Sequence, residues 1–407
     1  MVTKDNNHIS EPNNAGITIK NAAEDRYSRL RLIPWWDQER LHQARILVVG
    51  AGALGNEVLK NLALLGVGNI LIVDLDTIEN SNLSRSILYR SEHEGKSKAM
   101  VAAEQVQLIN PDCKTVGMSA DVVINLGLGV FRWADTVIGC LDNREARLAI
   151  NQSCWKVGRP WIDGAIEALL GIVRVFVPPE GTCYECTMNE EDYRLLNQRR
   201  SCTLLSRSEM ESGKVPTTPT SASIIAGVQV QEAVKLLHNR SDLPTLAGKG
   251  WFYNGITHDS YVTEYTRKDQ CLSHETYEEI KQISNSVYDT RLDEILTIIR
   301  SEIGTEAIME LERELVIGLE CRQCQSYQPL FRVLGTVTEE AARCPVCGST
   351  RTPVLTHRIS GGESFLDKTL DQIGIPPFDI ITGKGNGRVC HFELIGDADK
   401  VLRNLDH

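Results

Sequence analysis

A glycine turn followed by an aspartate gives the chain the pattern of a nucleotide site. The apolar run from Ile46 to Val49 leads into Gly50, Gly52 and Gly55, and Asp74 follows Gly55 by 19 residues. Backbone without side chains can turn tightly and approach a phosphate, and the start of the next helix offers N–H groups and partial positive charge. A carboxylate placed like Asp74 can accept hydrogen bonds from ribose. The default interpretation is a dinucleotide-dependent oxidoreductase, and a purely structural turn is the alternative.

Polar and charged residues beyond the turn fit ATP better than a redox cofactor. They stand in three stretches, 76–85, 95–98 and 140–144. A redox enzyme has little use for several cations and an acid gathered about a glycine turn. An enzyme that cleaves ATP needs cations to neutralise the triphosphate, and a carboxylate can hold the Mg²⁺ that bridges phosphate oxygens. The expected cofactors are therefore ATP and Mg²⁺.

Twelve cysteines sort by their spacing. Cys321 with Cys324, and Cys344 with Cys347, form two C-x-x-C pairs separated by 19 residues. Four thiolates at this spacing can surround Zn²⁺ as a tetrahedron, which predicts a structural zinc ribbon. In a reducing compartment such pairs indicate zinc rather than disulfides.

The composition excludes several classes of protein. The chain has 407 residues, 42% hydrophobic and 24% charged, with a formal net charge of −11. These values are typical of a globular protein with two or three domains. A net negative charge argues against nucleic acid as the main partner, and no apolar run has the length of a membrane span. The polar N-terminus lacks a signal-peptide pattern, so we expect a cytoplasmic protein.

Buried strands and helices must place these residues. Ile46–Val49 and Asn69–Val73 read as parallel strands covered on both faces, because their apolar runs lack polar alternation. The stretch 56–65 between them reads as an amphipathic helix, which completes a strand, turn, helix and strand unit. The fold class is therefore α/β, with a Rossmann-like doubly wound sheet, a zinc ribbon and a small α+β C-terminal domain.

Changes of composition along the chain predict its domain boundaries. We expect a disordered tail over 1–22 and an ATP-binding domain over 23–274 that contains a long loop, 187–221. A helical connector over 275–318, the zinc ribbon over 319–353 and an α+β domain over 354–407 follow. The last of these is either a β-grasp domain or a plain structural appendage.

The motifs between about Arg26 and Thr266 resemble the family of ThiF, MoeB and the ubiquitin-activating enzymes. In the family's order they read R-Y-x-R, G-x-G-x-x-G, D-x-D-x-I-x-x-S-N-L-x-R, G-x-x-K, D-N-x-x-x-R and C-x-x-C. The resemblance implies a Rossmann-like fold of the ThiF/MoeB type. It also implies adenylation of the C-terminal glycine of a ubiquitin-like protein. One departure is Ala53, where many members have another glycine.

The resemblance assigns roles residue by residue. Gly50, Gly52 and Gly55 line the nucleotide, and Asp74 holds the ribose. The residues that contact the phosphates are Asn82, Arg85 and Lys98. Asp142 coordinates Mg²⁺. Arg29 resembles the arginine that reaches the triphosphate from the partner subunit, so its use implies a dimer, which we expect to be a homodimer.

Cys202 resembles the thioester-forming cysteine of ubiquitin-type activating enzymes. It stands in Cys202-Thr203-Leu204, which is similar to their C-T-[IL] signature. Arg199 and Arg200 would favour its thiolate, which could attack the adenylate and carry the small protein. The alternative is an incidental loop cysteine.

A second zinc site is implied where family members often carry two C-x-x-C pairs. Here Cys183 and Cys186 would join Cys271 and His274, since three thiolates and an imidazole are a good zinc set. Cross-pairing of Cys183 and Cys186 with one ribbon knuckle is the alternative.

The partners are accordingly a ubiquitin-like β-grasp protein and a conjugating enzyme or target. Activation of a sulfur-carrier protein for cofactor or tRNA thiolation is the alternative within the family. A dehydrogenase and a scaffold with a decayed ATP site are the alternatives outside it. The sequence does not name the carrier protein or its final target.

Overall fold

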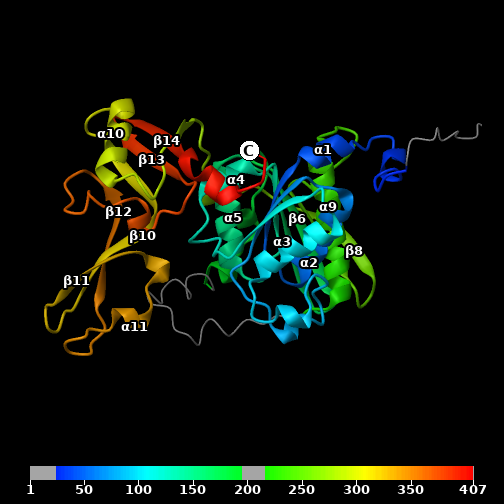
Figure 1. The fold of residues 1–407 in the computed structure, drawn as a ribbon, viewed down its shortest axis with the longest axis horizontal. Helices are drawn as coiled ribbons and strands as arrows, with labels where there is room; N and C mark the ends of the chain where they lie inside the picture. Colours follow the sequence, from blue (N-terminus) through cyan, green and yellow to red (C-terminus); the bar gives the residue numbers. More distant parts are fainter. Residues whose placement is uncertain (1–23, 195–215, 407) are drawn as a thin grey trace, which may run out of the picture.

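The computed structural model describes residues 24–194 and 216–406, which form two β-sheets (Figure 1). The predicted tail over 1–22 and most of the predicted loop over 187–221, including Cys202, lie outside these residues. No helix among the described residues combines the length and the hydropathy that crossing a membrane requires.

The larger sheet has eight strands in the order β3-β2-β1-β4-β5-β6-β7-β8. Strands β3 to β5 of this order run parallel, and β5 to β8 are antiparallel. The strands are β1 (Arg45–Val49), β2 (Asn69–Val73), β3 (Lys114–Met118), β4 (Thr136–Gly139), β5 (Trp161–Glu167), β6 (Leu170–Phe176), β7 (Lys249–Asn254) and β8 (Asp259–Glu264). The parallel half is the predicted doubly wound sheet.

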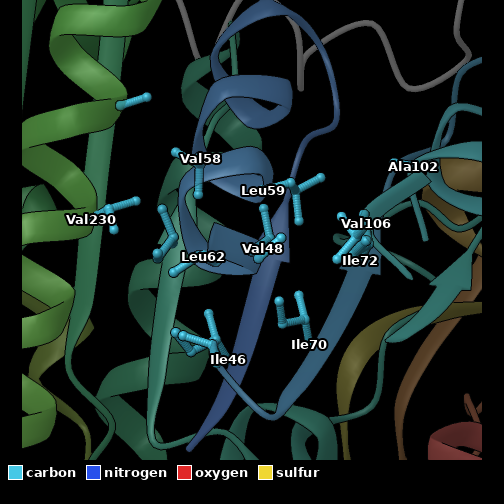
Figure 2. Packing of buried hydrophobic residues seen from close by; sticks show 14 of the residues in the cluster. Ile46, Val48, Val58, Leu59, Leu62, Ile70, Ile72, Ala102, Val106 and Val230 are labelled. Atoms are coloured by element: carbon cyan, nitrogen blue, oxygen red, sulfur yellow. The ribbon is translucent and has the colours of Figure 1, made fainter. Parts of the chain in front are cut away.

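Helices cover both faces of this sheet, which is why its central strands are apolar throughout. One face packs against α2 (Ala53–Leu65), α3 (Lys98–Ile109) and α9 (Pro219–His238). Figure 2 shows Ile46, Val48, Ile70 and Ile72 of the strands facing Val58, Leu59 and Leu62 of α2, with Val230 and Val106 from the flanking helices. The other face packs against α4 (Leu128–Trp133) and α5 (Arg144–Lys156).

Short elements complete the part of the chain up to residue 274. They are η1 (Leu30–Leu32), α1 (Gln38–Gln43), η2 (Asn80–Asn82), η3 (Ser91–His93), α6 (Tyr184–Thr187) and η4 (Leu272–His274).

The smaller sheet has six strands and contains residues from all three predicted C-terminal segments. Its order is β11-β10-β13-β14-β9, and β12 also pairs with β10. The strands are β9 (Ile280–Ile283), β10 (Ile308–Glu320), β11 (Tyr327–Val333), β12 (Thr352–Ile359), β13 (Ile380–Gly385) and β14 (Arg388–Leu394). The remaining elements are α10 (Leu292–Ile303), η5 (Leu334–Thr336), α11 (Glu339–Ala342), η6 (Asp371–Ile373), η7 (Ile395–Asp397) and α12 (Ala398–Leu402).

The prediction of a helical connector over 275–318 is wrong for β9 and β10. Only α10 is helical there. Glu310 and Arg313 have the i, i+3 spacing of an oppositely charged pair on an exposed helix. In the structure their strand gains its stability from β11, β12 and β13, which come later in the chain and pair with it.

The two sheets are joined by a polar and apolar contact along α4 and α5. The N–H of Leu128 donates to Asp379 Oδ1 at 2.7 Å, and the N–H of Gly129 donates to the carbonyl of Phe378 at 3.0 Å. Phe378 and Leu402 belong to the core beneath the larger sheet. The C-terminal residues, red in Figure 1, thus pack onto α4 and fix one unit against the other.

Candidate functional site

The predicted nucleotide residues follow neighbouring strands at one edge of the larger sheet. Gly50 follows β1, Asp74 follows β2, and Asp142 lies between β4 and α5. The helix after β1 covers one face of the sheet and the helix after β4 covers the other. The chain therefore diverges between β1 and β4, and a crevice at such a point is where open α/β sheets bind ligands.

The glycines of the turn have different steric roles. Gly50 has φ of +95°, and a Cβ there would lie 2.4 Å from the carbonyl oxygen of Cys140. A Cβ on Gly55 would lie 2.0 Å from the carbonyl oxygen of Gly50. A Cβ on Gly52 would meet nothing within 4 Å, and Gly52 begins α2 without a side-chain cap. The turn thus leaves open space over an uncapped helix N-terminus, which fits a phosphate group.

Asp74 is held by the backbone beside that turn. Its Oδ2 accepts from the N–H of Ala51 at 2.6 Å, and its Oδ1 accepts from the N–H of Asp76 at 2.8 Å. Burial raises the pKa of Asp74, while the charge of Lys98 and these two hydrogen bonds oppose the rise. Each oxygen keeps a further lone pair, so the carboxylate can still accept from a ribose hydroxyl.

Lys98 is brought to the same place by the start of α3. Its Nζ lies 2.7 Å from Asp76 Oδ2, and the Lys98 side chain is 12% exposed against 67% for Asp76. Asp76, the second aspartate of the D-x-D motif, is the partner of Lys98 in the structure. An ammonium group held by an exposed carboxylate can turn to an arriving phosphate at small cost.

Asn82 and Arg85 lie on the turn that follows Asp76. Asn82 Oδ1 accepts from the N–H of Glu79 at 3.0 Å, and Arg85 donates to the carbonyl of Ser81 at 2.7 Å. Both therefore stabilise their own loop, and their phosphate contacts stay a prediction.

Two buried residues that the motifs did not single out tie this loop to the glycine turn. Asn56 donates to the carbonyl of Ala51 at 2.7 Å and accepts from the N–H of Leu88 at 2.8 Å. Tyr89 donates to the same Ala51 carbonyl at 2.6 Å. The sequence could have indicated Asn56, because it places an amide side chain on the apolar face of a predicted helix.

Arg29 and Asp142 are both exposed. Arg29 precedes η1, in a segment that Tyr27 anchors by accepting a hydrogen bond from Asn110 at 2.7 Å. Asp142 is followed by Asn143, which caps α5. The reach of Arg29 into a partner's site and the binding of Mg²⁺ by Asp142 stay predictions.

The second predicted metal set comes together around α6 and η4. Cys183, Cys186, Cys271 and His274 offer ligand atoms that all lie within 4.8 Å of one another. Cys183 Sγ lies 3.7 Å from Cys186 Sγ and 3.5 Å from Cys271 Sγ, and Cys186 Sγ lies 3.4 Å from His274 Nε2. Three sulfurs and a nitrogen converging in this way fit tetrahedral Zn²⁺.

Groups around this cluster connect it to the rest of the domain. The ring of Trp155, on α5, stacks on His274 with centroids 4.7 Å apart. Glu185 accepts from the hydroxyl of Tyr193 at 3.0 Å and from Ser273. The histidine-containing cluster (Cys183, Cys186, Cys271 and His274) is therefore packed against the helix that begins beside Asp142.

The predicted ribbon cysteines also converge. The ligand atoms of Cys321, Cys324, Cys344 and Cys347 lie within 4.8 Å of one another. The N–H of Gln325 donates to the carbonyl of Cys321, and the N–H of Gly348 donates to the carbonyl of Cys344. Gln325 and Gly348 have φ of 56° and 75°, so each C-x-x-C pair closes in a tight knuckle. A hydrogen bond from Ser326 lowers the pKa of Cys344 to about 5, which favours thiolate. This four-cysteine cluster fits Zn²⁺ as well.

Comparison with known proteins places this architecture in a family. Residues 25–273 match the ThiF family. The chain is 29% identical over 237 residues to ubiquitin-like modifier-activating enzyme 5 of Dictyostelium discoideum, covering 54% of this chain and 58% of the relative. It is 37% identical over 170 residues to the sulfur carrier protein adenylyltransferase of Thermus thermophilus, covering 40% and 63%.

A further relative and one solved structure agree. The SAMP-activating enzyme E1 of Haloferax volcanii is 30% identical over 256 residues, which cover 61% of this chain and 87% of the relative. The structure of E. coli MccB with ATP superposes with a TM-score of 0.52 at 21% identity, covering 65% of this chain and 76% of that one, and supports the fold. The chain spans only 22% to 63% of the length of four curated relatives that it matches. With the family match covering more than half of its residues, the chain belongs to the ThiF family.

Proposed function

We propose that this chain uses ATP and Mg²⁺ to adenylate the C-terminal carboxylate of a small β-grasp protein. The observation that carries the proposal is that Asp74 and the adjoining Lys98–Asp76 ion pair lie beside the open space over Gly52. This place lies where β1 and β4 diverge, as in other nucleotide-binding α/β sheets. Membership of the ThiF family supports the proposal, as do relatives named as activating enzymes and adenylyltransferases.

In the proposed reaction a carboxylate oxygen of the carrier attacks the α-phosphorus of ATP. The bond to the β-phosphate breaks, pyrophosphate leaves, and a mixed anhydride of carrier and AMP forms. Asp74 would hold the ribose, and Lys98, Arg85 and Asn82 would contact the phosphates. Mg²⁺, when held by Asp142, would neutralise phosphate charge. This step needs no protein nucleophile, because positioning and charge neutralisation lower its barrier.

Cys202 is our candidate for the next step. Its thiolate would attack the carrier's carbonyl carbon, AMP would leave, and a thioester would pass to a conjugating enzyme or target. This proposal rests on the sequence, because Cys202 lies outside the described residues. The alternative is direct use of the adenylate for sulfur transfer, which the similarity to the Thermus sulfur carrier protein adenylyltransferase supports.

The remaining parts of the proposal concern assembly and metals. We propose a homodimer in which Arg29 reaches the partner's triphosphate, and structural Zn²⁺ in both the histidine-containing and the four-cysteine clusters. Thiolate ligands of this kind suit the reducing cytoplasm. We take 23–274 as the adenylation domain and 275–407 as an accessory unit. A β-grasp identity for 354–407 stays a prediction.

ATP–pyrophosphate exchange with candidate β-grasp proteins tests the adenylation step. We expect exchange with a carrier that ends in Gly-Gly, and none with the same carrier lacking its last glycine. Asp142→Asn should abolish exchange. No exchange with any carrier tested, or exchange that ignores the carrier's last residue, would contradict the proposal.

A non-reducing gel tests the thioester step separately. Cys202→Ala should keep exchange and lose the reducible carrier adduct. Exchange without an adduct in the wild type would favour the sulfur-carrier alternative. Loss of exchange in a folded Cys202→Ala protein would count against the assignment of Cys202.

A further inference from the structure

The four residues between β4 and α5, Cys140 to Asn143, carry Asp142 and are held from several sides. We call them the β4–α5 connection. At its start, the N–H of Cys140 donates to the carbonyl of Val49 at 2.8 Å. At its end, Asn143 Oδ1 accepts from the N–H of Ala146 at 2.8 Å and caps α5. An exposed carboxylate in the middle is thus carried on a fixed backbone.

Gln229 holds the strand end before the connection. Its side chain, on α9, is fully buried and donates from Nε2 to the carbonyl of Gly139 at 2.9 Å. The same Nε2 lies 3.4 Å from the carbonyl of Ile162 on the next strand. One amide therefore joins the end of β4, just before Asp142, to the second residue of β5.

Arg147 holds the connection itself. Its guanidinium donates from Nε to Asp163 Oδ1 at 2.8 Å, and from one terminal nitrogen to the carbonyl of Leu141 and, at 3.3 Å, to that of Gly164. Leu141 immediately precedes Asp142. A planar guanidinium with several donors can hold a carboxylate and a carbonyl in one geometry, which a lysine cannot do.

Asp163 orients this arginine from beneath. It is fully buried on β5, and Arg174 donates to its Oδ2 from Nε at 2.9 Å. Burial opposes its ionisation, but Arg174 and Arg147 together hold the pKa of Asp163 below its usual value. Buried ion networks of this kind are often no more stabilising than apolar side chains. The network of Arg174, Asp163 and Arg147 is therefore better explained by a positioning role, because Arg147 binds the Leu141 carbonyl immediately before Asp142.

We infer that Arg147 is a positioning residue that, oriented by Asp163, sets the Asp142 carboxylate for Mg²⁺ bound to ATP. The inference rests on the proposed function, because it takes Asp142 as the magnesium ligand. It extends the site into the core, where the motif D-N-x-x-x-R supplies both the carboxylate and, five residues later, the arginine that places it. Arg147 touches no substrate and acts only through the backbone of Leu141.

Magnesium-dependent binding of a fluorescent ATP analogue to the full chain tests this role without turnover or carrier. In wild type, Mg²⁺ should tighten binding with a measurable midpoint. Arg147→Lys keeps the positive charge but cannot donate to Asp163 and the Leu141 carbonyl in the same geometry. It should raise that midpoint about tenfold, which is the usual effect of removing a residue that orients a metal ligand. Arg174→Lys alters the same Asp163 without touching Leu141. It should lower the melting temperature to a similar degree and leave the midpoint within about twofold.

A double variant separates positioning from general damage. If Arg147 acts through Asp142, then Arg147→Lys should add no further shift in the background of Asp142→Asn. Equal shifts in Arg147→Lys and Arg174→Lys, or full additivity with Asp142→Asn, would overturn the inference. Wild type that binds no ATP analogue would instead refute the proposed function, so the two failures are distinguishable.

Discussion

At the scale of single residues, the site is a small set of charged groups whose partners the structure identifies. Asp74 could be chosen from the sequence by its spacing from the glycine turn, and Lys98 and Asp142 by the family motifs that contain them. Asp163 and Gln229 could not, and the motif contained Arg147 without its role, because only tertiary packing places these residues behind Asp142. The local sequence pattern predicts where a residue lies on its own helix or strand. Contacts between elements that are distant in the sequence can be identified only from the folded structure.

Replacing Lys98 by alanine should weaken ATP binding strongly. The change removes a charged donor to phosphate, worth about 1.5–3 kcal/mol, or about 10- to 100-fold in Kd. Lys60→Ala is the matched control, because Lys60 is also a helical lysine paired with a carboxylate, that of Glu57. Equilibrium titration of both variants decides the matter. Equal Kd values for the two would remove Lys98 from the site.

Stability should fall in acid because of His391. Burial lowers the pKa of His391 to about 4, helped by Lys156 and Lys384 and opposed by Glu312, while Tyr277 stacks on its ring. Since the unfolded side chain titrates near pH 6.5, the unfolded state takes up the proton first as pH falls. The stability present above pH 6.5 should therefore decrease towards pH 4, by at most about 3 kcal/mol.

Denaturant unfolding at several pH values measures this loss. His391→Gln should flatten the decrease between pH 6.5 and 4, whereas His42→Gln, at an exposed position on α1, should not. A wild-type profile that is flat over this window would refute the assignment.

At the scale of elements, the glycines of the turn before α2 serve two purposes. Gly55 allows close packing, and Gly52 leaves space for a ligand. The strand, turn and helix from Arg45 to Leu65 were predictable because their apolar periods are unambiguous. The strand β10 was not, because its charged first half resembles a helix and its partners lie far along the chain. Strand stability depends on neighbours that the local sequence does not specify.

Alanine at two glycines of the turn should have opposite consequences. Gly55→Ala places a Cβ against the carbonyl of Gly50 and should lower the free energy of unfolding by about 1–3 kcal/mol or more. Gly52→Ala meets open space and should leave the melting temperature nearly unchanged, but it should reduce the stabilisation that ATP provides. Thermal melts with and without ATP give both quantities. A Gly52→Ala protein with full ATP stabilisation would show that phosphate does not lie over this residue.

At the scale of the whole molecule, two units share a fixed contact and each contains one candidate zinc cluster. The grouping of Cys183, Cys186, Cys271 and His274 follows the predicted pairing, and the cross-pairing with a ribbon knuckle is excluded by the convergence of the four ribbon cysteines. The contact of Phe378 and Asp379 with α4 was not predictable, because neither side carries a motif.

The two clusters should differ in what their loss affects. Elemental analysis should find about two zinc ions per chain. Cys271→Ser should lose about one and weaken ATP binding, because His274 stacks on Trp155 of α5. Cys324→Ser should also lose about one, yet leave ATP affinity within about twofold, since its cluster lies in the smaller unit. One zinc or fewer in the wild type would contradict the pairing.

The fate of oxygen in the carrier's C-terminal carboxylate tests the central claim most directly. If that carboxylate attacks the α-phosphorus, one of its oxygens becomes the bridge to AMP, and later attack at the carbonyl leaves that oxygen on AMP. A carrier labelled with ¹⁸O at its terminal carboxylate, incubated with enzyme, Mg²⁺ and ATP, should yield AMP carrying one ¹⁸O atom as measured by mass spectrometry. Unlabelled AMP, or ADP and phosphate in place of AMP and pyrophosphate, would contradict the account.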